Sequence, residues 1–160
     1  MPITYNIDEN QKKPDPVLLV EDEDDHARLV RKSLTEHGRL VNEIFRVKDG
    51  DEAMKFISQT GPYNKENAPR PGLILLDLKL PIKDGFQVLR ELKADDRCKT
   101  IPVVVLTTSI TSDDARQAME LGANDYIVKP VKFPDFVEKV GHLGHYWVFT
   151  SDSRMGNSKI

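Results

Sequence analysis

The sequence predicts an α/β protein in which a parallel β-sheet is sandwiched between helices. Five short apolar segments alternate with five segments of helical periodicity along the 160 residues. The apolar segments lack polar alternation, as expected of strands that are buried on both faces. Four of them end directly in polar residues. These observations indicate right-handed crossovers and a ligand site beyond the carboxyl ends of the strands.

The composition agrees with one globular domain, because 160 residues with 39% hydrophobic and 31% charged side chains can build one core. We expect residues 1–15 to be a flexible leader, 16–149 the domain and 150–160 a polar tail. The net charge of -3 gives no reason to expect nucleic acid or a membrane as partner. No transmembrane segment or signal peptide is recognisable, and the single cysteine, Cys98, favours a cytoplasmic location.

The first predicted strand is Val17–Val20, and Glu21 and Asp22 lie directly at its end. The acidic residues 23–25 that follow indicate a solvated turn or a helix start, because acids favour helix N-termini. Gly38 is the expected end of this helix, whose apolar residues have roughly helical spacing: Ala27, Leu29, Val30 and Leu34. Ile44–Val47 is the second strand. Asp49 and Glu52 have the spacing of a capping box, which begins a helix with Ala53, Met54, Phe56 and Ile57 inside.

The segment 61–72 holds three prolines and two glycines, so we expect a long loop that is either functional or mobile. Leu73–Asp77 is the third strand, and Pro81 follows it. The next helix begins at Asp84-Gly85, and its expected inner residues are Phe86, Val88, Leu89 and Leu92.

The fourth strand is 102–106, and Thr111 or Ser112 caps the following helix, which ends at Gly122. Its expected inner residues are Ala115, Ala118 and Met119. The fifth strand, 126–128, leads to a last helix that begins near Pro134. The residues that line this helix are Phe136, Val137, Val140 and Leu143.

The polar residues at the strand ends indicate phosphoryl chemistry. Glu21, Asp22 and Asp77 would repel one another in one pocket, and Mg²⁺ is the cation that such hard oxygen ligands favour. Lys129 adds a positive charge for a phosphoryl oxygen, and Thr107 adds a hydroxyl donor. These parts match a site where Asp77 accepts a phosphoryl group. The structural alternatives are a salt bridge between Lys129 and Asp77, and a Thr107 that bonds only to backbone.

The chain resembles the receiver domains of two-component response regulators from about residue 17 to 147. The motifs that carry this resemblance are Leu19-Val20-Glu21-Asp22, Leu76-Asp77-Leu78-Lys79-Leu80-Pro81, Asp84-Gly85, Leu106-Thr107-Thr108-Ser109, Gly122-Ala123 and Tyr126-Ile127-Val128-Lys129-Pro130. The resemblance implies a flavodoxin-like, three-layer fold whose five strands are ordered 2-1-3-4-5. The chain is thus expected to be a single-domain response regulator that a histidine kinase phosphorylates, and not an enzyme beyond its own phosphorylation and dephosphorylation.

The resemblance also assigns roles to residues. Asp77 would be the phosphoacceptor, and Asp22, Asp77 and the backbone carbonyl of Lys79 would bind Mg²⁺, with Glu21 acting through a bound water. Lys129 would contact the phosphoryl group. Thr107 and Tyr126 resemble the two switch residues. Lys79 departs from the small neutral residue that many receivers carry there, which leaves the phosphate lifetime open.

The 61–72 loop, the Thr107-Thr108-Ser109 run and the aromatic residues 146–149 are similar to small regulators that partner bacterial phytochromes. The sequence therefore predicts a phytochrome-type kinase as partner. Tyr146, Trp147, Val148 and Phe149 cannot all bury in one core, so we expect a homodimer through the last helix and this aromatic end. The alternative is that Trp147 and Phe149 cover the monomer's own core edge.

Other functions fit less well. A haloacid-dehalogenase phosphatase needs a second aspartate at the position of Lys79, and a flavodoxin needs a hydroxyl- and glycine-rich loop where this chain has acids. The absence of a basic recognition helix argues against the receiver half of a transcription factor. The remaining alternative is an intermediate receiver in a multistep phosphorelay.

Overall fold

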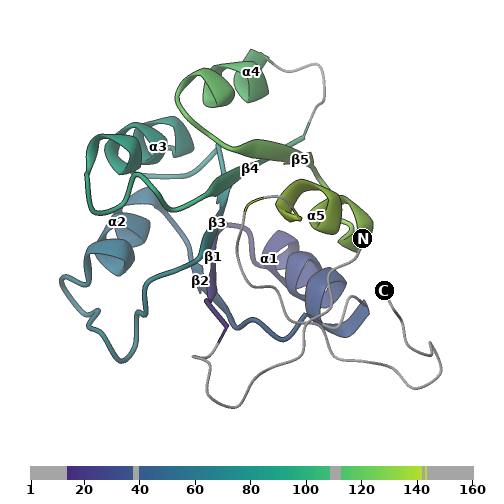
Figure 1. Cartoon of the computed structure of the whole chain (residues 1–160), viewed down its shortest axis with the longest axis horizontal. Coiled ribbons are helices and arrows are strands. Elements are labelled where there is room, and N and C mark those ends of the chain that lie inside the picture. Colours follow the sequence, from purple (N-terminus) through teal and green to yellow (C-terminus); the bar gives the residue numbers. More distant parts are fainter. Residues whose placement is uncertain (1–13, 38–39, 109–112, 142, 144–160) are drawn as a thin grey trace.

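A five-stranded parallel sheet with the order β2-β1-β3-β4-β5 forms the centre of the molecule (Figure 1). This computed structural model describes residues 14–37, 40–108, 113–141 and 143. The strand order is the one that the resemblance implied. The strands are β1 (Val17–Val20), β2 (Ile44–Val47), β3 (Leu73–Asp77), β4 (Val103–Thr107) and β5 (Asp125–Val128).

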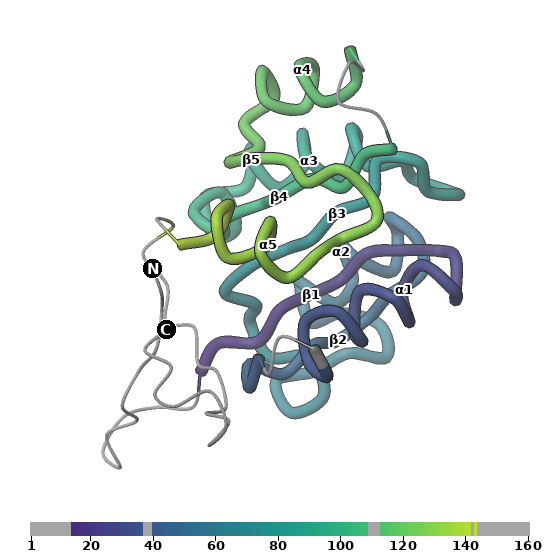
Figure 2. The backbone as a smooth tube through the Cα atoms, turned by 90° about the vertical axis from the view of Figure 1, so that its right-hand side faces the viewer, coloured from purple at the N-terminus to yellow at the C-terminus, as the bar shows by residue number. Residues whose placement is uncertain are grey.

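Helices follow the strands in the predicted alternation, and they cover both faces of the sheet (Figures 1 and 2). They are α1 (Asp24–Arg31), a π-helical continuation η1 (Lys32–His37), α2 (Gly50–Ser58), α3 (Gly85–Ala94), α4 (Asp113–Glu120) and α5 (Phe133–Val140). The predicted stop at Gly38 and the caps at Thr111 or Ser112 lie outside the described residues. None of the helices described here combines the length and the apolar character that crossing a bilayer requires.

The core has two halves, because successive strand residues point to opposite faces of the sheet. Leu18, Val20, Ile74 and Leu76 pack on one face against buried residues of α2 and α3, and Ala118 of α4 joins them. On the other face α1 and α5 pack on the alternate strand residues, which include Val17, Leu19, Leu73 and Leu75.

Two predicted core residues lie at the surface instead. Leu29 is 54% exposed and Met119 is 39% exposed. In both short helices the buried positions belong to neighbours, which are Ala27 and Val30 in α1 and Ala115 and Ala118 in α4. The prediction grouped Leu29 and Met119 with the inner residues of their helices and is wrong for both, because each helix contacts the sheet over a narrower face than its apolar spacing indicates.

Side-chain caps fix the beginnings of α2 and α3. Asp49 accepts a hydrogen bond from the backbone N–H of Glu52 at 2.7 Å, as the capping-box spacing predicts. The Glu52 side chain reaches the N–H of Lys48 at 2.9 Å rather than that of Asp49. Asp84 accepts in the same way from Gln87, at 3.0 Å.

The long loop before β3 is tied to its surroundings by hydrogen bonds. The Tyr63 hydroxyl donates to Glu52 at 2.6 Å, and its ring stacks edge-on against Phe56 with centroids 5.2 Å apart. The Arg70 guanidinium donates to the Arg97 carbonyl at 2.7 Å. These contacts join the loop to α2 and to the α3–β4 connection.

Candidate functional site

The register of the sheet brings the predicted acidic residues together. Val20 pairs with Leu76 across β1 and β3, so Glu21 and Asp77 follow at the same level of the carboxyl edge. Glu21 is fully buried and Asp77 is 7% exposed, whereas Asp22 is exposed. One carboxylate oxygen from each of Glu21, Asp22 and Asp77 lies within 4.8 Å of the others. This oxygen cluster has the chemistry and the spacing that a hard divalent cation requires.

Lys129, at the end of β5, is the positive charge of this cluster. Its Nζ lies 2.8 Å from Oε1 of Glu21 and 3.1 Å from Oδ2 of Asp77. Burial alone would lower the pKa of Lys129, but the hydrogen bond with Glu21 and the charge of Asp77 outweigh burial and raise the pKa above its ordinary value. Lys129 therefore carries its charge at neutral pH.

Burial raises the pKa of Glu21, and the neighbouring charge of Asp77 raises it further. Lys129 and the backbone N–H of Glu23, which lies 3.3 Å from the carboxylate, act in the opposite direction without cancelling the rise. The charged form of Glu21 is therefore destabilised by its surroundings, and an added positive charge nearby would stabilise it. The electrostatics of the cluster therefore favour a bound cation.

The turn after β3 holds Asp77 in place. One Asp77 carboxylate oxygen accepts a hydrogen bond from the backbone N–H of Lys79 at 3.2 Å, while the Lys79 side chain is exposed. Gly85 begins α3 directly behind this turn, and a Cβ there would lie 2.5 Å from the Asp77 carbonyl oxygen. Glycine is thus required for the close approach of α3 to the phosphoacceptor candidate.

Thr107 and Tyr126 lie on one face of the sheet. Tyr126 pairs with Val105, and Thr107 follows Val105 by two residues, so all three side chains point to the α4 side. Thr107 is buried at the end of β4, and its carbonyl accepts from the N–H of Lys129 at 2.7 Å. Tyr126 is half-buried, and the Lys139 ammonium lies 4.6 Å from the centroid of its ring.

Two residues of the site were missed by sequence reasoning. His26 of α1 places Nδ1 at 3.2 Å from Nζ of Lys129. Arg46 of β2 donates through Nε to the Glu21 carbonyl at 2.9 Å and through Nη1 to Asp24 at 2.8 Å, and its hydrogen bond is the main cause that lowers the Asp24 pKa. The only signal for Arg46 was a charged residue within an apolar strand, and His26 gave none because acids surround it.

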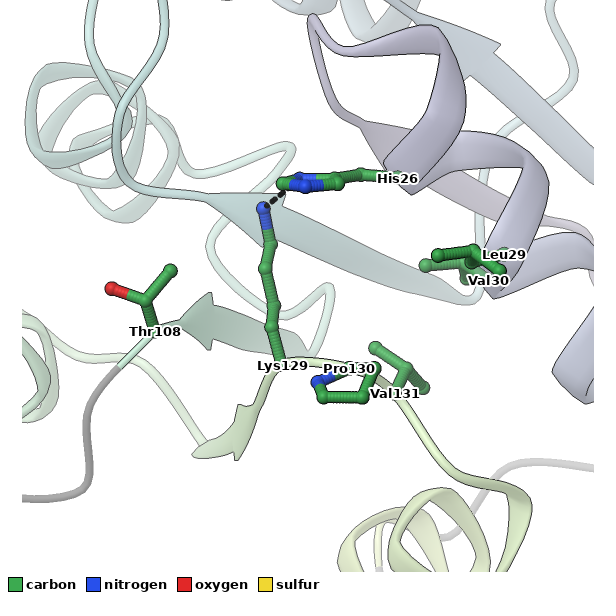
Figure 3. Close-up of a pocket in the computed structure, with 7 residues that line it drawn as sticks. All are labelled: His26, Leu29, Val30, Thr108, Lys129, Pro130 and Val131. Carbon is green, nitrogen blue, oxygen red and sulfur yellow. Dashed lines mark hydrogen bonds between the residues drawn. The ribbon is translucent and has the colours of Figure 1, made fainter.

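A pocket of about 210 Å³ adjoins the acidic cluster between α1 and the β5–α5 connection (Figure 3). Leu29, which lies outside the core, lines this pocket. Lys129 stands between the pocket and the carboxylates. The other lining residues are His26, Val30, Thr108, Pro130 and Val131.

The structure thus brings together Glu21, Asp22, Asp77 and Lys129, with Thr107 and Tyr126 on the adjacent strands. The aromatic residues 146–149, on which the predicted dimer contact depends, and Ser109 lie outside the described residues. α5 does seat on the sheet as expected, with Phe136 and Val140 buried and Leu143 packed beside them.

Comparison with known proteins finds relatives of the whole domain. The protein-family model described as response regulator receiver domain matches residues 17–141. The response regulator Rcp1 of Synechocystis sp. is 44% identical over 137 residues, which cover 86% of this chain and 91% of that protein.

Two solved structures are similar throughout the described fold. The bacteriophytochrome response regulator AtBRR has a TM-score of 0.79 and 38% identity, with 88% of this chain and 100% of that chain covered. The Mn²⁺-bound form of response regulator Rcp1 has a TM-score of 0.65 and 46% identity, with 79% of this chain and 89% of that chain covered.

Proposed function

This chain belongs to the response regulator receiver domain family, and we propose that it accepts a phosphoryl group on Asp77 from a histidine kinase. The observation that carries the proposal is the carboxylate of Asp77, which faces Glu21 and Asp22 and lies 3.1 Å from Nζ of Lys129. An oxygen of Asp77 forms a bond to phosphorus while the bond from phosphorus to the donor nitrogen breaks. The electron pair of that bond returns to the leaving imidazole of the kinase.

Receiver domains bind a divalent cation, and we propose Mg²⁺ here. Asp22, Asp77 and the backbone carbonyl of Lys79 would hold it, with Glu21 acting through a bound water. When bound, the cation supplies positive charge that offsets the negative charge of the transferring group. The oxygen cluster of Glu21, Asp22 and Asp77 supports this assignment.

Lys129 supplies the second positive charge. Its salt bridge to Asp77, which the sequence raised as a structural alternative, serves as the resting contact of the unphosphorylated state. After transfer, the Lys129 ammonium and the Thr107 hydroxyl donate to phosphoryl oxygens. Movement of Thr107 vacates space on its face of the sheet, and Tyr126 turns inward to fill it. The surface formed by α4, β5 and α5 then changes its packing.

The similar proteins support a phytochrome-type kinase as the partner. AtBRR is described as a bacteriophytochrome response regulator, and this chain aligns with all of that chain at 38% identity. A homodimer through the last helix and Tyr146-Trp147-Val148-Phe149 belongs to the same proposal. Sedimentation of wild type against Trp147→Ala, at micromolar concentration, tests it: a monomeric wild type, with or without beryllofluoride, contradicts the dimer.

The central experiment uses acetyl phosphate and Mg²⁺ with wild type and Asp77→Asn. We expect one phosphoryl group on the wild type and none on the variant, by intact-protein mass spectrometry. Beryllofluoride with Mg²⁺ should shift the NMR signals of Thr107 and Tyr126 in wild type alone. Incorporation that persists in Asp77→Asn would contradict the assignment of the phosphoacceptor.

A further inference from the structure

His26 of α1 contacts the ammonium of Lys129 from the helix side of the site. It lies in the first turn of α1, and its ring lies next to Nζ of Lys129 (Figure 3). Its side chain is 37% exposed. The function proposed above uses Lys129 but gives no role to this imidazole.

The Lys129 ammonium has three N–H donors and no acceptor. Three groups with lone pairs surround it: Asp77 Oδ2 at 3.1 Å and His26 Nδ1 at 3.2 Å lie within hydrogen-bond distance, and Glu21 Oε1 forms an ion pair with it at 2.8 Å. The two carboxylates come from the sheet edge and the imidazole comes from α1. His26 therefore completes the set of acceptors from the opposite side.

The contact with Lys129 requires one tautomer of the imidazole. Because the ammonium can only donate, the contact forms when Nδ1 accepts and the hydrogen is on Nε2, and Nδ1 also lies 3.8 Å from Oε2 of Glu21. Nε2 in turn lies 3.7 Å from Oε1 of Glu23, on the outer side of the ring. The imidazole is thus oriented between an acidic group outside and the Lys129 ammonium inside.

We propose that His26 is a positioning residue for Lys129 in the phosphorylation of Asp77. This inference rests on the function proposed above. When Asp77 becomes phosphorylated, its Oδ2 ceases to be the carboxylate partner of Lys129. Glu21 and His26 then remain as the two fixed acceptors, and they direct the third N–H of the ammonium toward the phosphoryl oxygen. Without His26 the ammonium has one fixed acceptor and more directions to sample, so fewer molecules are aligned for transfer.

The test compares two substitutions at one position. Asn places its Oδ1 where the imidazole places Nδ1, so His26→Asn keeps an acceptor, whereas His26→Leu removes it. With acetyl phosphate and Mg²⁺, we expect His26→Leu to be phosphorylated about five- to tenfold more slowly than wild type. His26→Asn should stay within about twofold of the wild-type rate.

A second readout reports the contact without any phosphoryl transfer. The ¹⁵N-lysine ammonium signal of Lys129, assigned by its loss in Lys129→Arg, should be sharp in wild type and His26→Asn. In His26→Leu it should shift and broaden. Mg²⁺ affinity, measured by calorimetry, should agree within about twofold among the three proteins, because Mg²⁺ favours oxygen ligands and an imidazole nitrogen that accepts from Lys129 is not one of them.

Each other result contradicts the proposal. If His26→Leu reacts at the wild-type rate, or if the Lys129 signal does not change, His26 does not position the ammonium. If His26→Asn is as slow as His26→Leu, the rate does not depend on an acceptor atom at this position. A large loss of Mg²⁺ affinity in His26→Leu would assign His26 to the metal instead. Failure of the wild type itself to be phosphorylated would refute the proposed function, which is a separate outcome.

Discussion

The α2–α3 side of the molecule and helix α4 pack on the same face of the sheet, but they are held there by different amounts of apolar surface. α3 alone buries Val88, Leu89 and Leu92, and α2 buries Phe56. α4 buries only two alanines, Ala115 and Ala118. Because the free energy of burial scales with the apolar area removed from water, α4 can be repositioned at a much smaller cost.

The aromatic residues show the same difference. Phe56 packs between Phe45 and Tyr63, with ring centroids 5.6 Å and 5.2 Å away. Tyr126, the proposed switch residue, is half-buried and has Lys139 over its ring. On this face of the sheet, the region around α2 and α3 is therefore strongly packed, and the region around α4 and Tyr126 is lightly packed. The lightly packed region lies beside Thr107, where a phosphoryl signal would first act.

The largest expected change in the free energy of unfolding comes from the strongly packed region around α2 and α3. Phe56→Ala should lower the free energy of unfolding by about 3–5 kcal/mol, because it leaves a cavity between α2, β2 and the 61–72 loop. Met119→Ala on α4 should lower it by clearly less, since that side chain is 39% exposed and belongs to neither core cluster. Urea unfolding followed by circular dichroism measures both. Equal effects at the two positions would remove the contrast between the two sides.

The next effect concerns how α2 begins. Asp49→Ala removes the side-chain acceptor for the N–H of Glu52 and should cost about 1 kcal/mol in the same unfolding experiment. Asp49→Asn retains an acceptor oxygen, so we expect it to cost clearly less. If the two variants are equally destabilised, the cap does not contribute as the geometry indicates.

The loop between β3 and α3 should respond in the opposite direction. Ile82 has φ of 69° and is 83% exposed, so a β-branched residue occupies the left-handed region without burying its side chain. Ile82→Asn should raise the free energy of unfolding by about 1 kcal/mol, because Asn tolerates this conformation better. Ile82→Val, equally β-branched, should leave it unchanged. A loss of stability in Ile82→Asn would mean that the exposed isoleucine contributes contacts.

The smallest effect is a pH dependence at Tyr63. Burial and the hydrogen bond to Glu52 raise the pKa of Tyr63 to about 12. Since the folded pKa lies above that of the unfolded chain, the stabilisation is fully present below about pH 10 and is lost as the pH rises through the folded value. The stability difference between wild type and Tyr63→Phe should therefore shrink from pH 10 upward. A constant difference across that range would contradict the raised pKa.

The sequence predicted which polar residues share one edge of the sheet better than it predicted the margins of the helices. Glu21, Asp77, Thr107 and Lys129 could be found because each directly follows an apolar run, and parallel strands end at one edge. Leu29 could not be placed, because helical spacing does not tell how wide a contact α1 makes with the sheet. Likewise, the spacing of Asp49 and Glu52 correctly predicted that Asp49 caps the helix. It did not predict that the Glu52 side chain accepts from the N–H of Lys48, because this depends on the backbone conformation before the helix.

The sequence by itself determined the alternation of strands and helices and the chemical types at the strand ends, because both are written in local patterns of apolar and polar residues. Tertiary structure alone decided the distances between the groups at the sheet edge and the addition of a helix residue to them. The partners of Lys129 illustrate this, since Asp77 lies 52 residues and His26 lies 103 residues away along the chain. Such contacts depend on the register of the sheet and on the seating of α1 against the β5–α5 connection. No local pattern encodes the position of α1 relative to Lys129, so the role proposed for His26 could be inferred only from the folded chain.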